Sequence, residues 1–89
     1  MAAFQSALEV YTKADLPQDW ARTQNNLGLA LHDLATRSGR AKGRKLLGQA
    51  VAAFKSALEV YTKADLPQDW ARTQNNLDIA LKELGKLSR

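Results

Sequence analysis

The stretch AAFKSALEVYTKADLPQDWARTQNNL at residues 52–77 repeats residues 2–27 with one difference, Lys55 in place of Gln5. A direct repeat with an offset of 50 residues is typical of modular proteins, in which each unit covers the apolar face of its neighbour. Such arrays present surfaces to partners and have no single deep pocket. The repeat therefore predicts an architecture more closely than it predicts a partner.

The apolar residues of this repeat follow the period of an α-helix. Between residues 46 and 63 they recur every third or fourth position along one face, at Leu47, Ala50, Val51, Phe54, Ala57, Leu58 and Tyr61. Residues 20–34 have the same spacing, and residues 70–84 echo it. We therefore predict an all-α fold with helices near residues 2–13, 16–36, 44–63 and 66–87.

The connections between these helices are of two kinds. Pro17 and Pro67 fit only the first turn of a helix, and Asp15 with Gln18 has the spacing of a capping box. These short turns predict antiparallel neighbours. Between the second and third helices, Gly39 and Gly43 predict a longer, flexible loop over residues 37–45. That loop also carries the bases Arg37, Arg40, Lys42, Arg44 and Lys45.

Composition limits the class of protein. The chain has 89 residues, which predicts a single domain over residues 1–89, and its net charge of +4 comes from the basic loop. There is no cysteine and only one histidine, so we expect neither a metal site nor a cofactor. No apolar run approaches the roughly 18 residues of a membrane span, so we expect no membrane contact and a cytoplasmic location.

The sequence resembles a known repeat family at two places. Asn26-Leu27-Gly28, followed by Ala30 and Leu31, resembles the first helix of a tetratricopeptide repeat (TPR), and residues 50–60 resemble the second. The resemblance covers nearly the whole chain and implies antiparallel helical hairpins stacked as a right-handed α-solenoid. Because the usual repeat has about 34 residues, the 50-residue offset is more similar to the extended bacterial variant. We expect the chain to be a fragment or a designed excerpt of a longer array.

The resemblance also implies how the repeats pack. Small residues at Gly28, Ala50 and Ala57 allow helices to approach closely, and large ones fill the gaps between them. We interpret both tryptophans as packing residues at helix ends, in preference to a ligand-stacking platform. The residues expected to pack the repeats are Trp20, Leu27, Gly28, Leu31, Ala50, Phe54, Ala57, Leu58, Tyr61, Trp70 and Leu77.

The family binds peptides in a concave groove lined by first helices. Asparagine can donate to and accept from a peptide backbone, and arginine or lysine can hold a carboxylate. The candidate peptide-binding residues are Arg22, Asn25, Asn26, His32, Arg72, Asn75, Asn76 and Lys82. The alternatives are that the asparagines bond a neighbouring helix and order the stack, that the arginines are solvated, and that His32 is simply exposed.

The last predicted helix differs from its counterpart at several positions, including three that carry polar residues. Asp78 replaces Gly28, Lys82 replaces His32 and Glu83 replaces Asp33. We expect these polar residues to act as a solubilising cap on the final helix of the array.

No nucleophile and base arrangement, phosphate loop or metal-ligand spacing stands out, so we predict no enzymatic activity. The leading hypothesis is a scaffold module that binds a protein or peptide and self-associates as a homodimer, with domain swapping as one route to that dimer. One alternative is a structural or engineered repeat unit without an external ligand. A third is weak nucleic-acid binding through the basic loop, which lacks the aromatic residues that stack on bases.

Overall fold

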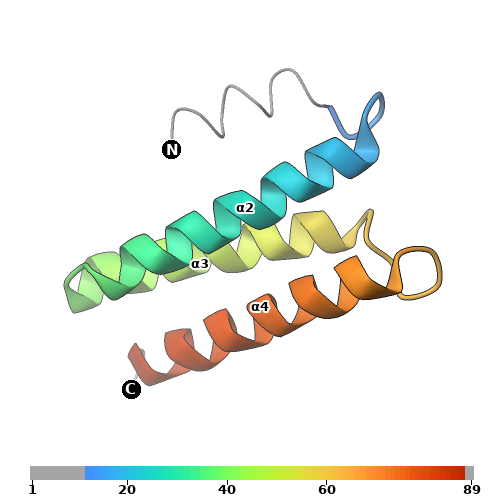
Figure 1. Cartoon of the computed structure of the whole chain (residues 1–89). Coiled ribbons are helices and arrows are strands. Elements are labelled where there is room, and N and C mark those ends of the chain that lie inside the picture. The colour runs from blue at the N-terminus through green and yellow to red at the C-terminus, as the bar shows by residue number, and fades with distance from the viewer. Residues whose placement is uncertain (1–11, 88–89) are drawn as a thin grey trace.

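The described part of the chain, residues 12–87 of a computed structural model, consists of three helices joined by short turns (Figure 1). Helix α2 spans Pro17–Thr36, α3 spans Arg40–Leu58 and α4 spans Pro67–Leu87. Residues 12–87 contain no strand, which confirms the all-α prediction for this part of the chain. The helix predicted near residues 2–13 lies almost entirely outside the described residues.

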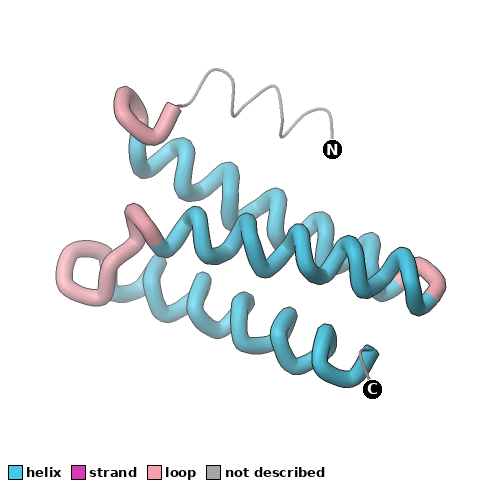
Figure 2. Tube along the Cα trace, turned by 180° about the vertical axis from the view of Figure 1, so that it is seen from behind, coloured by secondary structure: helices cyan, strands magenta, loops and turns pink. Residues whose placement is uncertain are grey.

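The three helices are arranged with α3 in the middle. It runs antiparallel to α2 and to α4 and packs against both, whereas α2 and α4 contact each other at only a few places (Figure 2). The two outer helices therefore run parallel, with α3 between them. None of the three is long and apolar enough to span a membrane.

The two proline turns have the same geometry. The backbone N–H of Asp15 donates to Thr12 Oγ1 at 3.1 Å, and that of Asp65 donates to Thr62 Oγ1 at 3.2 Å. Leu16 is the residue before α2 and makes no side-chain capping bond. The predicted capping box is therefore wrong, because threonine hydroxyls order the turn.

The basic loop is much shorter than predicted. Only residues 37–39 lie outside helices, and α3 begins at Arg40 with Gly39 at its N-cap. Gly43 donates its N–H to Gly39 O at 2.7 Å and is buried, and a Cβ built on it would lie 3.3 Å from Ala35 O. Gly43 thus allows α2 and α3 to approach closely, although the sequence pattern suggested a chain break.

Helix α3 also ends earlier than predicted, at Leu58 in place of residue 63. The N–H groups of Glu59 and Val60 each bond a carbonyl three residues back, at 3.1 Å, which tightens the last turn. Tyr61 nevertheless remains buried. The apolar period therefore continues into residues that are no longer helical.

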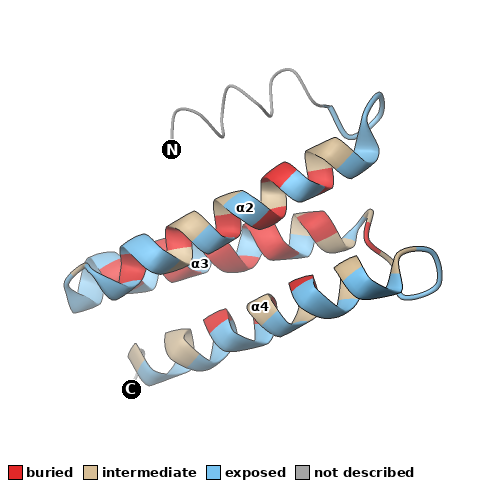
Figure 3. Ribbon diagram, viewed as in Figure 1, coloured by how far each residue is buried: buried red, intermediate tan, exposed pale blue. Residues whose placement is uncertain are grey.

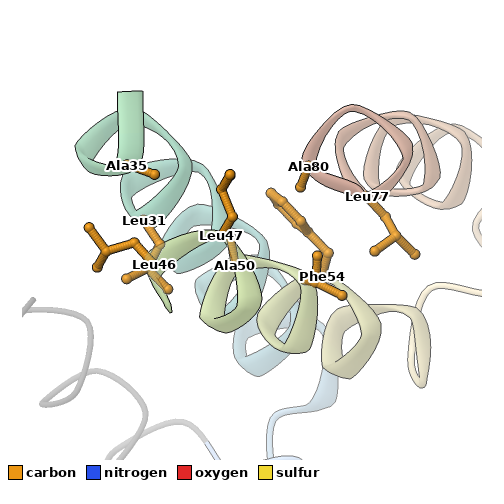
Figure 4. Packing of buried hydrophobic residues seen from close by; sticks show 9 residues of the cluster. Leu31, Ala35, Leu46, Leu47, Ala50, Phe54, Leu77 and Ala80 are labelled. Carbon is orange, nitrogen blue, oxygen red and sulfur yellow. The ribbon is translucent and has the colours of Figure 1, made fainter. Parts of the chain in front are cut away.

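The core lies along α3 (Figures 3 and 4). The main cluster joins buried residues of all three helices: Leu31, Ala35, Leu46, Leu47, Ala50, Val51, Phe54, Leu77 and Ala80. A smaller cluster of Ala21, Ala57 and Tyr61 lies under the half-buried Trp20 and Trp70. Leu27 and Leu58 are half-buried against the main cluster. The Nζ atoms of Lys13 and Lys63 lie 5.7 and 5.5 Å from the ring centroids of Trp20 and Trp70.

The tightest contact in this core is between Gly28 of α2 and Phe54 of α3. A Cβ built on Gly28 would lie 2.5 Å from Phe54 Cε1 and 2.7 Å from Cδ1, well inside van der Waals contact. Phe54 is itself only 1% exposed. The ring can occupy this position because residue 28 has no side chain.

Candidate functional site

A groove between α2 and α4 gathers most of the predicted peptide-binding residues. Its two walls are the parallel outer helices, and its floor comes from Phe54 of α3 and from Tyr61, which follows α3. The groove contains two cavities of different chemistry, one polar and one apolar.

The polar cavity has a volume of about 160 Å³. It lies toward the first turns of both outer helices. Its lining consists of Arg22, Asn25, Asn26, Tyr61, Asp69, Arg72 and Thr73. Since liquid water occupies about 30 Å³ per molecule, a space of this size can hold a carboxylate or an amide group.

The two arginines of the polar cavity occupy matching positions in the repeat. Arg22 Nη2 lies 2.5 Å from Asp19 Oδ1, and Arg72 Nη2 lies 2.5 Å from Asp69 Oδ1. Both guanidinium groups are more than half exposed, so these ion pairs contribute little to stability. Each guanidinium carries five N–H donors, and the pairing bond uses only some of them. The arginines can therefore also hold an incoming carboxylate.

Thr73 supplies a buried hydroxyl to the polar cavity. Its Oγ1 has no hydrogen-bond partner in the structure, whereas the matching Thr23 Oγ1 donates to Asp19 O at 2.8 Å. A buried polar atom without a partner costs about 1–3 kcal/mol. A polar group that enters the cavity and bonds this hydroxyl would remove that cost.

Tyr61 closes the bottom of the polar cavity. Burial raises the pKa of its hydroxyl above the ordinary value, and the nearby Asp69 carboxylate adds to this rise in pKa. Tyr61 therefore keeps its proton at neutral pH and can act as a hydrogen-bond donor.

The raised pKa of Tyr61 predicts a loss of stability in alkali. As pH rises above about 10, the unfolded chain loses the Tyr61 proton before the folded chain does, so the free energy of unfolding falls until the folded pKa is passed. The Tyr61→Phe variant lacks this loss. Urea unfolding of both chains, from about pH 8 to about pH 11, checks the prediction; lysines titrate in both chains and cancel. A difference between the chains that stays constant with pH would contradict it.

The apolar cavity has a volume of about 180 Å³ and is lined by Leu29, His32, Phe54, Asn76 and Ile79. Leu29 and Ile79 occupy matching repeat positions and are 42% and 43% exposed. Apolar cavities of about 150 Å³ accept a ring the size of benzene. The cavity can therefore take an aromatic or branched side chain, with both exposed residues flanking it.

Hydrogen bonds between the two outer helices define the groove. Asn76 Nδ2 donates to Asn25 Oδ1 at 3.3 Å, and since Asn25 lines the polar cavity and Asn76 the apolar one, this bond lies between them. Further along, His32 Nε2 lies 3.0 Å from Glu83 Oε2. The Asn25–Asn76 bond thus agrees with the alternative in which the asparagines bond a neighbouring helix. His32 is half-buried and paired with Glu83, so the alternative in which this histidine is simply exposed is wrong.

No family model, curated protein or solved structure matches this chain.

The structure brings six of the eight candidate peptide-binding residues into the groove. Arg22, Asn25, Asn26 and Arg72 line the polar cavity, and His32 and Asn76 line the apolar cavity. Asn75 and Lys82 are exposed and line neither cavity.

Sequence reasoning missed Leu29, Ile79 and Thr73 as site residues and placed Tyr61 and Phe54 only in the core. A signal for Leu29 and Ile79 was available, because both are apolar at matching repeat positions outside the predicted core stripe. For Thr73 there was none, since Thr23 is the same residue in the repeat yet has a bonded hydroxyl.

A larger hollow of about 390 Å³ lies between α2 and α3. Its lining is Gln24, Leu27, Leu31, Gln49, Ala52, Ala53 and Ser56, none of which is ionisable. It lacks the charged anchors that fix the orientation of a ligand. The groove between α2 and α4 is therefore the stronger candidate.

Proposed function

We propose that this chain is a non-enzymatic interaction module of the TPR type, which binds a protein segment in the groove between α2 and α4. The observation that carries the proposal is the pair of cavities on either side of the Asn25–Asn76 hydrogen bond. One offers cationic and hydroxyl donors and the other an apolar pocket, which is the combination that orients a peptide. The antiparallel order of the three helices and the close contact of Gly28 with Phe54 support the TPR type of packing.

The two cavities specify the chemistry of the ligand. A carboxylate, from an acidic side chain or a chain terminus, fits the polar cavity because Arg22, Arg72, Tyr61 and Thr73 can all donate to it. A nearby aromatic or branched side chain of the same segment fits the apolar cavity. The expected partner is thus a peptide that pairs an acidic group with a large apolar residue.

The experiment is capture on a peptide array in which the acidic and apolar positions vary independently. We expect the double variant Arg22→Ala and Arg72→Ala to weaken capture of the best peptides at least about tenfold, because hydrogen bonds to charged groups contribute about 1.5–3 kcal/mol each. The control is Lys42→Ala with Arg44→Ala, which removes the same charge from exposed positions of α3 outside the groove. Equal losses in both double variants would indicate non-specific attraction.

The apolar cavity is tested separately. Leu29→Asp should abolish capture that depends on the apolar residue of the peptide, since it places a charge at the cavity mouth. Leu16→Asp is the matched control, because Leu16 is also 42% exposed but lies outside the groove. An array that captures no peptide with the wild-type chain would instead favour a structural or engineered repeat unit without an external ligand.

A second copy of the chain is the alternative occupant of the groove. The exposed Leu29 and Ile79 favour this homodimer, since association would remove their apolar surface from water. Light scattering should then give a dimer mass that Leu29→Asp reduces to that of a monomer. The hinge that a domain-swapped form would use contains only residues 37–39, fewer than the sequence suggested.

A further inference from the structure

One face of α2 recurs on α4, where no element within residues 12–87 covers it. On α2 it consists of Ala21, Gly28, Leu31 and Ala35, all buried, and α3 covers it through Ala57, Phe54 and the main cluster. Their counterparts 50 residues later are Ala71, Asp78, Leu81 and Gly85, all exposed. We name these four residues the free face of α4. They correspond to the residues of α2 on which α3 packs, and the substantive change is Asp78 in place of Gly28.

That change falls where the packing is tightest. At Gly28 a Cβ would lie 2.5–2.8 Å from three ring atoms of Phe54, so no side chain fits there unless the ring moves. On α4 the same position holds Asp78, whose Oδ1 accepts a hydrogen bond from Gln74 Nε2 at 3.1 Å. A phenylalanine that approached α4 as Phe54 approaches α2 would meet this side chain and bury its carboxylate against an aromatic ring. Both the overlap and the loss of hydration oppose such an approach.

We propose that Asp78 is a specificity-determining residue that excludes a helix with the sequence of α3 from the free face of α4. Every copy of the chain carries that sequence in its own α3, and residues 2–8 repeat the last part of α3, residues 52–58, apart from Gln5. Without Asp78, the free face would therefore be complementary to a second copy in a head-to-tail contact. Contacts of this kind build rings or open filaments from many copies.

The proposal concerns a different surface from the groove and is independent of the peptide-binding function. Asp78 opposes the binding of a helix with the sequence of α3 and leaves peptide binding in the groove unaffected. The closed homodimer through Leu29 and Ile79 remains compatible with it, because neither residue belongs to the free face of α4.

The test is binding of a labelled synthetic peptide with the sequence of residues 40–63 to the full chain, followed by fluorescence anisotropy. We expect Asp78→Gly to bind this peptide at least about tenfold more tightly than the wild type, because overpacking of this kind costs about 1–3 kcal/mol. Asp78→Ala should gain clearly less than Asp78→Gly, since alanine removes the carboxylate but retains the Cβ that meets the ring. The gain of Asp78→Gly should vanish with a peptide in which the phenylalanine is replaced by alanine.

Two further measurements complete the design. Asp33→Gly is the matched control, because it makes the same substitution at an exposed position of α2 and should not change peptide binding; circular dichroism verifies that each variant keeps its helices. Sedimentation velocity of the chains alone should show species of Asp78→Gly that grow with concentration beyond those of the wild type. The proposal is overturned if Asp78→Gly binds no more peptide than the wild type, or if Asp78→Ala binds as tightly as Asp78→Gly.

Discussion

Replacement of Phe54 by alanine is expected to lower the free energy of unfolding at 25 °C by about 3–5 kcal/mol, a large share of the stability of a small domain. Phe54 is 1% exposed and is the largest fully buried side chain in the described residues. It contacts Gly28 of α2 and lies in one cluster with Leu77 and Ala80 of α4, so it joins both outer helices to α3 (Figure 4). Phenylalanine-to-alanine changes in a core cost about 3–5 kcal/mol, whereas whole domains are stable by only about 5–15 kcal/mol.

Urea unfolding followed by ellipticity at about 222 nm measures the effect of Phe54→Ala, with Leu81→Ala as the control. Leu81 is 43% exposed on α4, and substitutions at such surface positions usually change the free energy of unfolding by about 0.5 kcal/mol or less. A loss below about 1 kcal/mol for Phe54→Ala would contradict the central place of this ring in the core.

Replacement of Gly28 by alanine is expected to destabilise the chain even though alanine is the better helix former. The substitution gains about 1 kcal/mol of helix propensity. It also places a Cβ 2.5 Å from the buried Phe54 ring, and such overpacking costs about 1–3 kcal/mol. The ring cannot move away freely because it is surrounded by the main cluster, so we expect a net loss of up to about 2 kcal/mol in the free energy of unfolding.

Gly48→Ala is the matched control for Gly28→Ala. Gly48 lies within α3, and a Cβ built on it would have no heavy atom within 4 Å. The same substitution should therefore stabilise the chain by about 1 kcal/mol through helix propensity alone. Stabilisation in both variants would show that α2 and α3 lie further apart than in this structure.

A double variant isolates the contact between the two residues. Leucine at position 54 removes the ring edge that meets residue 28, so Gly28→Ala should cost less in the Phe54→Leu background than in the wild type. The difference is the coupling free energy, which is about 0.5–3 kcal/mol for residues in direct contact. Additive losses would mean that the cost of alanine at 28 arises elsewhere.

The outer helices were predictable from local signals. Helices expected at 16–36 and 66–87 are found at Pro17–Thr36 and Pro67–Leu87, because proline at the first helical position marks the start without reference to any neighbour. The helical period of the apolar residues likewise identified the face of α3 that carries Ala50, Phe54 and Ala57. These features depend on the order of residues along one segment.

The sequence predictions were wrong where the role of a residue depends on contacts with a helix that is distant in the sequence. Gly43 has the local signature of a chain break, but it is a helical residue whose missing side chain lets α3 approach Ala35. Thr23 and Thr73 are the same residue in the repeat, yet only the hydroxyl of Thr73 is buried without a partner. A sequence repeat suggests that residues 50 positions apart are equivalent, whereas in the folded chain they have different neighbouring side chains.

The candidate site shows the same division. The arginines and most of the asparagines were selected from the sequence because their side chains suit a peptide, and the structure gathers six of the eight in one groove. Asn75 was selected as the counterpart of Asn25, but it is exposed on α4 whereas Asn25 is buried between helices. A sequence pattern does not separate these two residues, since the stretches 2–27 and 52–77 that contain them are the same apart from Gln5.

The sequence by itself determined that the described chain is helical, where its outer helices begin and which stripe of each is apolar, because these depend on backbone constraints and on spacing within one segment. Only the tertiary structure decided which of two identical residues is buried, where the cavities lie and why residue 28 has no side chain. Those properties depend on which atoms from other helices occupy the surrounding space. The two copies meet different neighbours because α2 lies against α3 through the face that carries Gly28 and Leu31, whereas α4 lies against it through the face that carries Leu77 and Ala80.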